Sequence, residues 1–157
     1  MLPEPHGGTL SDYVPFYFTP FSPMMLNIKT GYGGVPRQAN ADIVIMVSSI
    51  AKLQKANVPF VFSDRHAYLN TARFSSNPAD LSWIGWDMLA ARDFRRDPND
   101  PSKFERYEAE ALVRTRMPAD ALIGVACYSD AVTQESARVL TEAGLTVQAR
   151  TRPGWYF

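Results

Sequence analysis

Two carboxylates with a spacing that suits catalysis stand in the stretch FERYEAEALV, residues 104–113. On a β-strand, side chains alternate between faces, so Glu108 and Glu110 would share one face while Ala111 and Val113 share the other. A carboxylate held on a rigid strand beside a cleft stabilises positive charge that develops during a reaction. The local pattern alone favours an ordinary helix, because Ala, Glu, Leu and Arg are good helix formers. On a helix, residues two apart do not share a face, so the secondary structure of this segment decides whether the pair acts together.

The composition is that of a folded protein with one core. The chain has 157 residues, 46% hydrophobic and 20% charged, which predicts a single domain over residues 1–157. Sixteen basic and sixteen acidic residues cancel, so any nucleic-acid surface must come from local clustering of charge. Residues 1–10 are rich in Pro and Gly, and we expect them to form an irregular lead-in.

The single cysteine, Cys127, excludes an internal disulfide and favours a reducing compartment, which predicts a cytoplasmic protein. Cys127 stands in an apolar run and is expected to be a buried thiol. No apolar run reaches the ~18 residues of a membrane helix, and the N-terminus lacks the pattern of a signal peptide. Two histidines and one cysteine argue against a structural zinc site, so no metal is expected.

Short strands and short helices alternate irregularly along the chain. The residue pattern predicts strands at residues 13–18, 43–47, 58–62, 122–127 and 145–150, and helices at 24–29, 49–56, 78–94 and 131–143. Pro15 places the first strand at a sheet edge or at its own start, and Ser48 is the candidate N-cap of the second helix. The β-branched run at 43–47 is typical of a strand buried on both faces. The sum is an α+β fold rather than a doubly wound sheet.

Three sequence blocks together resemble one family. The blocks are YVPFYFTPFSPMM at residues 13–25, FVFSDRHA at 60–67 and RYEAEALV at 106–113. In their order and spacing they resemble the DarT family of DNA ADP-ribosyltransferase toxins, which are paired in bacteria with the macrodomain antitoxin DarG. The resemblance implies an ADP-ribosyltransferase fold related to poly(ADP-ribose) polymerase catalytic domains, with two small mixed sheets and flanking short helices that clasp NAD. It also places Glu110 on a strand, against the local helical pattern.

The resemblance also implies roles for individual residues. Glu110 matches the family's catalytic glutamate, and His66 is the second catalytic candidate because a histidine suits a base near neutral pH. Tyr17 lies where related transferases place an aromatic ring against nicotinamide. Ser22 and Met24 fall at the nearby helix start and are the other residues expected to contact NAD. Without the resemblance, Tyr17 would be interpreted as part of a core strand and His66 as an ordinary loop histidine.

Residues expected to contact DNA are mostly basic or aromatic. Arg65 matches a residue near the DNA substrate, and Phe21 stands where some members carry arginine. Arg73 belongs to an arginine-rich region that can line a path for a strand, with Tyr68 or Phe74 as a stacking surface. The other arginines of that region are Arg92, Arg95 and Arg96, for which favourable charge at a helix end is the alternative explanation.

The implied reaction moves ADP-ribose from NAD to a base. Breaking the nicotinamide–ribose bond passes through an oxocarbenium-like transition state, which a carboxylate stabilises. Chemistry on a base edge requires an unpaired base, so single-stranded DNA is the natural substrate. The resemblance implies that the modified base is guanine or thymine. Phe21 together with Met24 and Met25 favours the guanine-modifying branch. Glu108 stands where glutamine is common.

Family members usually carry a further N-terminal segment with a histidine-bearing strand that grips NAD and a catalytic arginine. Neither has a counterpart here, since His6 precedes two glycines in a Pro-rich stretch. We therefore expect either a fragment or a shortened member. Two alternatives stay open: a catalytically inactive relative that binds DNA or the antitoxin, and a protein ADP-ribosyltransferase whose paired glutamates are Glu108 and Glu110. The expected partners are single-stranded DNA and a DarG-like antitoxin, with no membrane association and a monomeric state.

Overall fold

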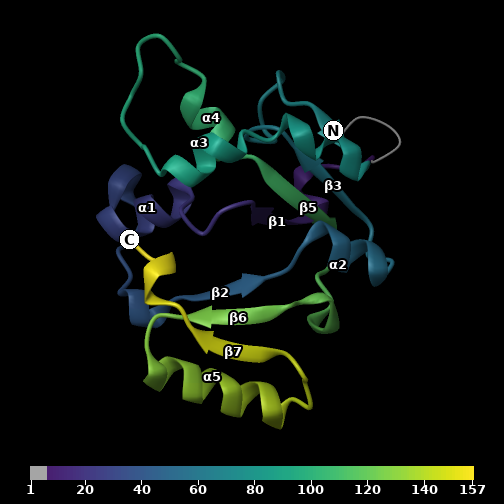
Figure 1. Cartoon of the computed structure of the whole chain (residues 1–157), viewed down its shortest axis with the longest axis vertical. Coiled ribbons are helices and arrows are strands. Elements are labelled where there is room, and N and C mark those ends of the chain that lie inside the picture. Colours follow the sequence, from purple (N-terminus) through teal and green to yellow (C-terminus); the bar gives the residue numbers. More distant parts are fainter. Residues whose placement is uncertain (1–6) are drawn as a thin grey trace. The chain divides into compact units, whose positions relative to one another are not determined.

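Figure 1 shows the computed structural model, which describes residues 7–157; most of the expected irregular lead-in, including His6, lies outside the described residues. The described chain forms two compact units, each assembled from two separate segments. One unit contains residues 7–23 and 58–117, and the other contains residues 24–57 and 118–157. The expectation of a single domain over residues 1–157 stays a prediction.

The first unit is built on a four-stranded antiparallel sheet of order β1-β5-β3-β4. Its strands are β1 (Tyr13–Tyr17), β3 (Phe60–Ser63), β4 (Phe74–Ser75) and β5 (Glu110–Arg114). β1 lies at the edge, as Pro15 predicts, because proline cannot donate a ladder hydrogen bond. β5 is central, and its Ala-Leu-Val run is buried, with Val113 fully so. A rigid, fully paired strand therefore begins at Glu110.

Three helical segments of the first unit connect these strands: the 3-10 helix Pro78–Trp83, α3 (Trp86–Ala91) and α4 (Lys103–Tyr107). The prediction of one helix over 78–94 is wrong. Ile84 is extended and Gly85 caps the start of α3, so the chain breaks there, where glycine disfavours a continuous helix. Arg92 ends α3 in the left-handed conformation, with φ 52°.

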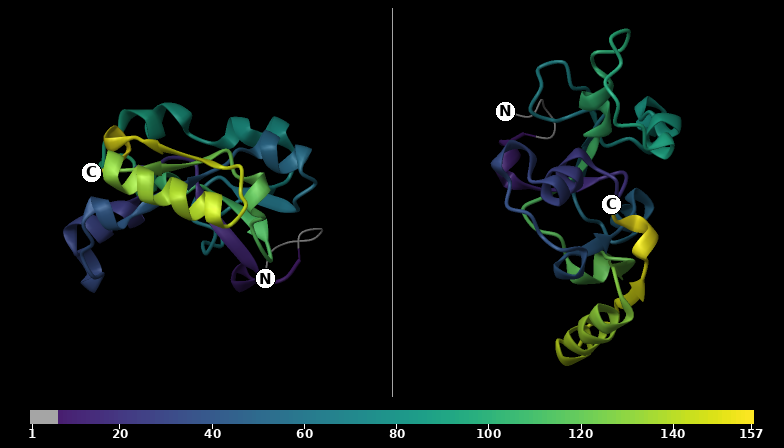
Figure 2. Two further views of the ribbon diagram at one scale, coloured as in Figure 1. Left: turned by 90° about the horizontal axis from the view of Figure 1, so that it is seen from below. Right: turned by 90° about the vertical axis from the view of Figure 1, so that its left-hand side faces the viewer.

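The second unit contains a three-stranded mixed sheet of order β2-β6-β7, in which β6 and β7 are parallel. The strands are β2 (Val44–Val47), β6 (Gly124–Cys127) and β7 (Gln148–Thr151), and α5 (Asp130–Glu142) packs against β6 and β7. The views in Figures 1 and 2 agree in placing α5 beside β7. Only this sheet is mixed, which corrects the expectation of two mixed sheets.

Two details of the second unit differ from the sequence-based predictions. β2 is an edge strand whose Val44 and Met46 are about half exposed, so the prediction of burial on both faces is wrong. The helix α2 (Ile50–Lys55) is capped by Ser49, whose hydroxyl accepts from the Lys52 N–H, and not by Ser48. Other elements agree closely with prediction: α1 (Pro23–Thr30) begins at its proline, and Cys127 is a buried free thiol.

Candidate active site

Glu110 is the first residue of the central strand β5. Tyr17 of β1 and Ser63 of β3 are its register partners on either side. Its side chain is buried, with 6% of the residue exposed. A carboxylate in the interior costs free energy unless hydrogen bonds compensate, so a buried glutamate at the end of a strand is a candidate for a functional position.

The loop after β3 supplies the contacts of that carboxylate. The backbone N–H of Ala67 donates to Oε1 of Glu110 at 3.0 Å. Nδ1 of His66 lies 3.5 Å from the same oxygen. Nδ1 is buried and has no hydrogen-bond partner within residues 7–157, although 43% of the His66 side chain is exposed. The exposed part of the ring is therefore the side away from Glu110.

Glu108 does not share a strand face with Glu110. It is the C-cap of α4, and its backbone N–H donates to the Glu105 carbonyl, so the strand begins only after Ala109. The shared face that a strand through both carboxylates would give is therefore absent, because the helix that the local pattern favoured is present at residues 103–107 and the strand starts at Glu110. The placement of Glu110 on a strand is confirmed.

Burial and nearby carboxylates raise the pKa values of Tyr17 and Glu108 in this cluster. Burial raises the pKa of Tyr17 to about 12, and the charges of Glu110 and Glu108 add to the effect. Burial also raises the pKa of Glu108; His66 opposes this shift, while Glu110 and Glu105 reinforce it. Tyr17 therefore stays neutral at physiological pH, with its phenol beside the carboxylate strand.

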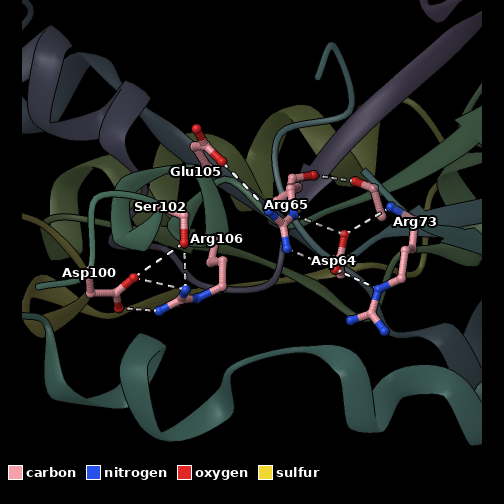
Figure 3. A network of polar contacts seen from close by, with 8 residues as sticks. Asp64, Arg65, Arg73, Asp100, Ser102, Glu105 and Arg106 are labelled. Carbon is pink, nitrogen blue, oxygen red and sulfur yellow. Dashed lines mark hydrogen bonds and ion pairs between the residues drawn. The ribbon is translucent and has the colours of Figure 1, made fainter. Parts of the chain in front are cut away.

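A second network holds the base of the loop. Figure 3 shows the buried Asp64 between Arg65 and Arg73. Asp64 accepts from the Arg73 backbone N–H at 3.0 Å and from Arg73 Nε at 2.8 Å, and Arg65 Nε lies 3.4 Å away. These donors hold the Asp64 pKa below its usual value, despite the opposing effect of burial. Arg65 also lies 3.7 Å from Glu105.

Asp64 was not among the residues predicted to matter. The sequence signal for its role is its position directly after a strand and beside an arginine. The structure buries Asp64, and a buried aspartate is almost always paired. Its bonds close the loop that carries His66 and Ala67 toward Glu110. The sequence suggested the flanking arginines as DNA contacts, and the structure gives them this additional structural role.

The predicted NAD residues divide between buried and exposed positions. Ser22 is buried, whereas Met24 at the start of α1 is 46% exposed. Tyr17 lies next to Glu110 through the β1–β5 pairing. The structure thus brings Tyr17, His66 and Glu110 together.

The aromatic and arginine candidates for DNA contact differ in how far the structure exposes them. Phe21 is only 5% exposed, and the Arg92 guanidinium stands 3.6 Å from its ring centroid. Phe74 packs against the core of its unit, whereas Tyr68 is 79% exposed. Arg95 pairs with Asp93. The ring of Phe21 is thus covered, and a base cannot stack on it in this conformation.

Within residues 7–157, no group of three or more His, Cys, Asp or Glu side chains is placed to hold a metal ion. In the same described part of the chain, no helix has the length and apolar character needed to cross a membrane.

Comparisons with known proteins place the chain in a family. A family model described as "ssDNA thymidine ADP-ribosyltransferase, DarT" matches residues 1–157. A DNA ADP-ribosyl transferase of Escherichia coli O127:H6 is 51% identical over 156 residues, covering 99% of this chain and 72% of that protein. A DNA ADP-ribosyl transferase of Thermus sp. is 37% identical, covering 99% of this chain and 74% of that protein.

Solved structures give the same answer at the level of the fold. Thermus sp. 2.9 DarT in complex with carba-NAD+ superposes with a TM-score of 0.88 at 34% identity, covering 99% of this chain and 79% of that one. Thermosipho africanus DarTG in complex with ADP-ribose has a TM-score of 0.68 at 13% identity, covering 93% of this chain and 36% of that one, and shares the fold. The family description names thymidine, whereas Phe21, Met24 and Met25 suggested the guanine-modifying branch, and the modified base stays a prediction. The matched family, the close relatives and the fold agree: this chain belongs to the DarT family of DNA ADP-ribosyltransferases.

Proposed function

We propose that this chain transfers ADP-ribose from NAD to a thymine base of single-stranded DNA, with Glu110 as the catalytic carboxylate. The observation that carries the proposal is the placement of Glu110: buried at the start of a central strand, held by the Ala67 N–H and adjacent to His66. Substrates named for relatives support it, since Thermus sp. 2.9 DarT has been solved with NAD+ and with ADP-ribosylated ssDNA.

The first step is cleavage of the bond between nicotinamide and ribose. The electron pair of that bond leaves with nicotinamide, which departs neutral, and positive charge builds on the ribose. The Glu110 carboxylate stabilises this charge electrostatically. Both contacts described above use Oε1, so we assign Oε2 to a ribose hydroxyl.

The second step joins the base to the ribose carbon. A ring N–H of thymine is a poor nucleophile until it loses its proton, so a base must be positioned near it. We assign that role to His66, whose buried Nδ1 faces Glu110 and whose remaining ring is open to solvent. When Nδ1 carries a proton, Glu110 orients the ring and supports the positive charge that forms on it, in the manner of a carboxylate–histidine pair.

The other residue roles that we propose rest on the family resemblance. Tyr17, Ser22 and Met24 contact NAD, with the neutral phenol of Tyr17 nearest the reacting end. Arg65 and Arg73 contact the DNA backbone. Arg92 is proposed in place of Phe21, since its guanidinium covers that ring. A DarG-like macrodomain antitoxin as partner, a monomeric state and a cytoplasmic location are proposed with them.

The test uses single-stranded oligonucleotides that contain either thymine or guanine, but not both. Each is incubated with the chain and NAD, and the product mass is measured. We expect one ADP-ribose to be added to the thymine oligonucleotide only. Addition to the guanine oligonucleotide alone would refute the base assignment, and labelling of protein without DNA would refute the substrate class.

A further inference from the structure

Tyr68 is a large aromatic residue that the fold leaves in water. It is 79% exposed, so it adds little to the core of its unit. Single exposed aromatics are common on protein surfaces and carry no meaning by themselves. Tyr68 differs because of the loop on which it stands and the residues beside it.

The loop that carries Tyr68 is closed and braced. At its base, Asp64 and Arg73 exchange backbone and side-chain hydrogen bonds, with the Asp64 N–H donating to the Arg73 carbonyl at 3.2 Å. Within it, the Leu69 N–H donates to the His66 carbonyl at 3.1 Å, and the Ala72 N–H to the Leu69 carbonyl at 3.0 Å. The His66 N–H donates to the Glu105 carbonyl at 2.9 Å. A ring on such a loop loses little conformational entropy when a ligand stacks on it.

The loop also ties Tyr68 to the catalytic carboxylate. Ala67, its immediate neighbour, donates its N–H to Glu110. The Tyr68 and His66 rings form a tilted contact, with centroids 6.4 Å apart and planes inclined by 32°, and this contact leaves 79% of Tyr68 exposed. Tyr68 thus stands next to the reaction centre with its ring available to a ligand.

Charge near the loop fits a nucleic-acid ligand. Arg73, at the other end of the loop, keeps 55% of its side chain exposed while pairing with Asp64. Its guanidinium also lies 4.6 Å from the Trp83 ring centroid, so only part of it is open to a ligand. A partly exposed arginine and an exposed aromatic ring on one braced loop are the two elements with which proteins bind single strands: one contacts phosphate and the other stacks on a base.

We propose that Tyr68 is a stacking platform for an unpaired base of the DNA substrate at the mouth of the active site. This inference rests on the proposed function and adds a specific contact to it. Stacking accepts any base, because every base has a π-face, so Tyr68 contributes to DNA affinity rather than to the choice of the modified base.

The test compares Tyr68→Ala, Tyr68→Phe and Tyr68→Leu with wild type. Fluorescence anisotropy gives the Kd for a labelled thymine-containing single strand, and steady-state kinetics give KM for DNA and for NAD. Tyr32→Ala is the matched control, since Tyr32 is 69% exposed and lies in a 3-10 turn of the other unit. Circular dichroism of each variant checks folding.

We expect Tyr68→Ala to raise the DNA Kd and KM by about 5- to 150-fold, the range of base–aromatic stacking, with KM for NAD unchanged. Tyr68→Phe should remain near wild type, and Tyr68→Leu should resemble Tyr68→Ala because it keeps apolar bulk without a π-face. An unchanged DNA Kd in Tyr68→Ala, or Tyr68→Leu at wild-type affinity, would overturn the inference.

The failure of the proposed function has a different signature. A wild-type chain that binds the single strand but adds no ADP-ribose would contradict that function, and the effect of Tyr68→Ala on binding would still decide the stacking contact. Loss of DNA modification in Tyr68→Ala with intact DNA binding would also overturn the inference, since it would point to a contact with another partner or substrate.

Discussion

Asp64 holds the loop that presents His66 and Ala67 to Glu110, so its removal tests the architecture of the site. Asp64→Ala deletes a buried acceptor of the Arg73 N–H and of the Arg73 side chain. A hydrogen bond to a charged group contributes about 1.5–3 kcal/mol. The pair with the Arg73 side chain, which is half exposed, contributes only about 0–1 kcal/mol because solvent screens it.

The sum predicts that Asp64→Ala lowers the free energy of unfolding by about 1.5–4 kcal/mol. Asp64→Asn keeps one oxygen that accepts from the Arg73 N–H but loses the charge and turns an amide NH2 toward the arginine donors, so its loss should be about 1–3 kcal/mol. Urea denaturation measures both values. The matched control is Asp97→Asn, an exposed loop aspartate whose replacement should change stability by less than about 0.5 kcal/mol.

Hydrogen exchange of the Arg73 and Ala67 amides localises the effect. Both should lose protection in Asp64→Ala, because the first loses its acceptor and the second loses the loop geometry that brings it to Glu110. If the variant unfolds at the wild-type urea concentration with both amides still protected, then Asp64 does not hold the loop and the reasoning is refuted.

The stability contributed by the Asp64 charge depends on pH in a predictable direction. The folded-state pKa of Asp64 is lowered from its usual 3.8, so its charge stabilises the protein fully above that value. This contribution is lost as the pH falls from about 4 toward the lowered pKa. The stability difference between wild type and Asp64→Asn should therefore shrink below about pH 4; a difference that stays constant would contradict the assignment.

Two further predictions concern tyrosines of the first unit. The Tyr17 pKa of about 12 is due first to burial and second to the charge of Glu110, so Glu110→Gln should lower that pKa while leaving it above 10. Titration followed by NMR of the ring carbons measures the pKa. An unchanged value would mean that the Glu110 charge does not act on the Tyr17 phenol. Because the folded pKa is raised, Tyr17 stabilises the protein below pH 10 and this contribution is lost as the pH rises toward 12. The buried Tyr107 hydroxyl donates to the Met88 carbonyl at 2.7 Å and accepts from the Asp93 N–H at 2.9 Å. Tyr107→Phe should cost about 1–3 kcal/mol in urea denaturation, and a cost near zero would mean that water replaces the hydroxyl.

Features with a strong local signal could be predicted from the sequence. The aromatic run at β1, the Ser-Pro start of α1 and the long amphipathic α5 lie close to where the pattern places them. Proline in β1 predicted an edge strand because its missing N–H is a local property. The position of Glu110 on a strand was predicted from three sequence blocks considered together, since its own segment resembles a helix.

Features that depend on tertiary packing could not be predicted. The apolar pattern of β2 does not indicate whether a neighbour covers it, and the structure leaves Val44 and Met46 half exposed. The pairing of Asp64 with Arg73 joins residues nine apart around a loop, so no local periodicity indicates it. The covering of Phe21 by Arg92 likewise joins segments that are distant in sequence.

The most direct test of the account compares two glutamates that are two residues apart. Glu110→Gln keeps the side-chain volume and an acceptor for the Ala67 N–H but removes the charge, so the fold should persist. Glu108→Gln removes a charge at the C-cap of α4, outside the strand.

Measured by the rate of ADP-ribose addition to a thymine-containing single strand, Glu110→Gln should lose about 10²- to 10³-fold in kcat, the cost of removing one preorganised electrostatic stabiliser. Glu108→Gln should retain activity near wild type. Wild-type turnover in a folded Glu110→Gln variant would contradict the central claim, and a loss confined to Glu108→Gln would move the catalytic role to the other carboxylate.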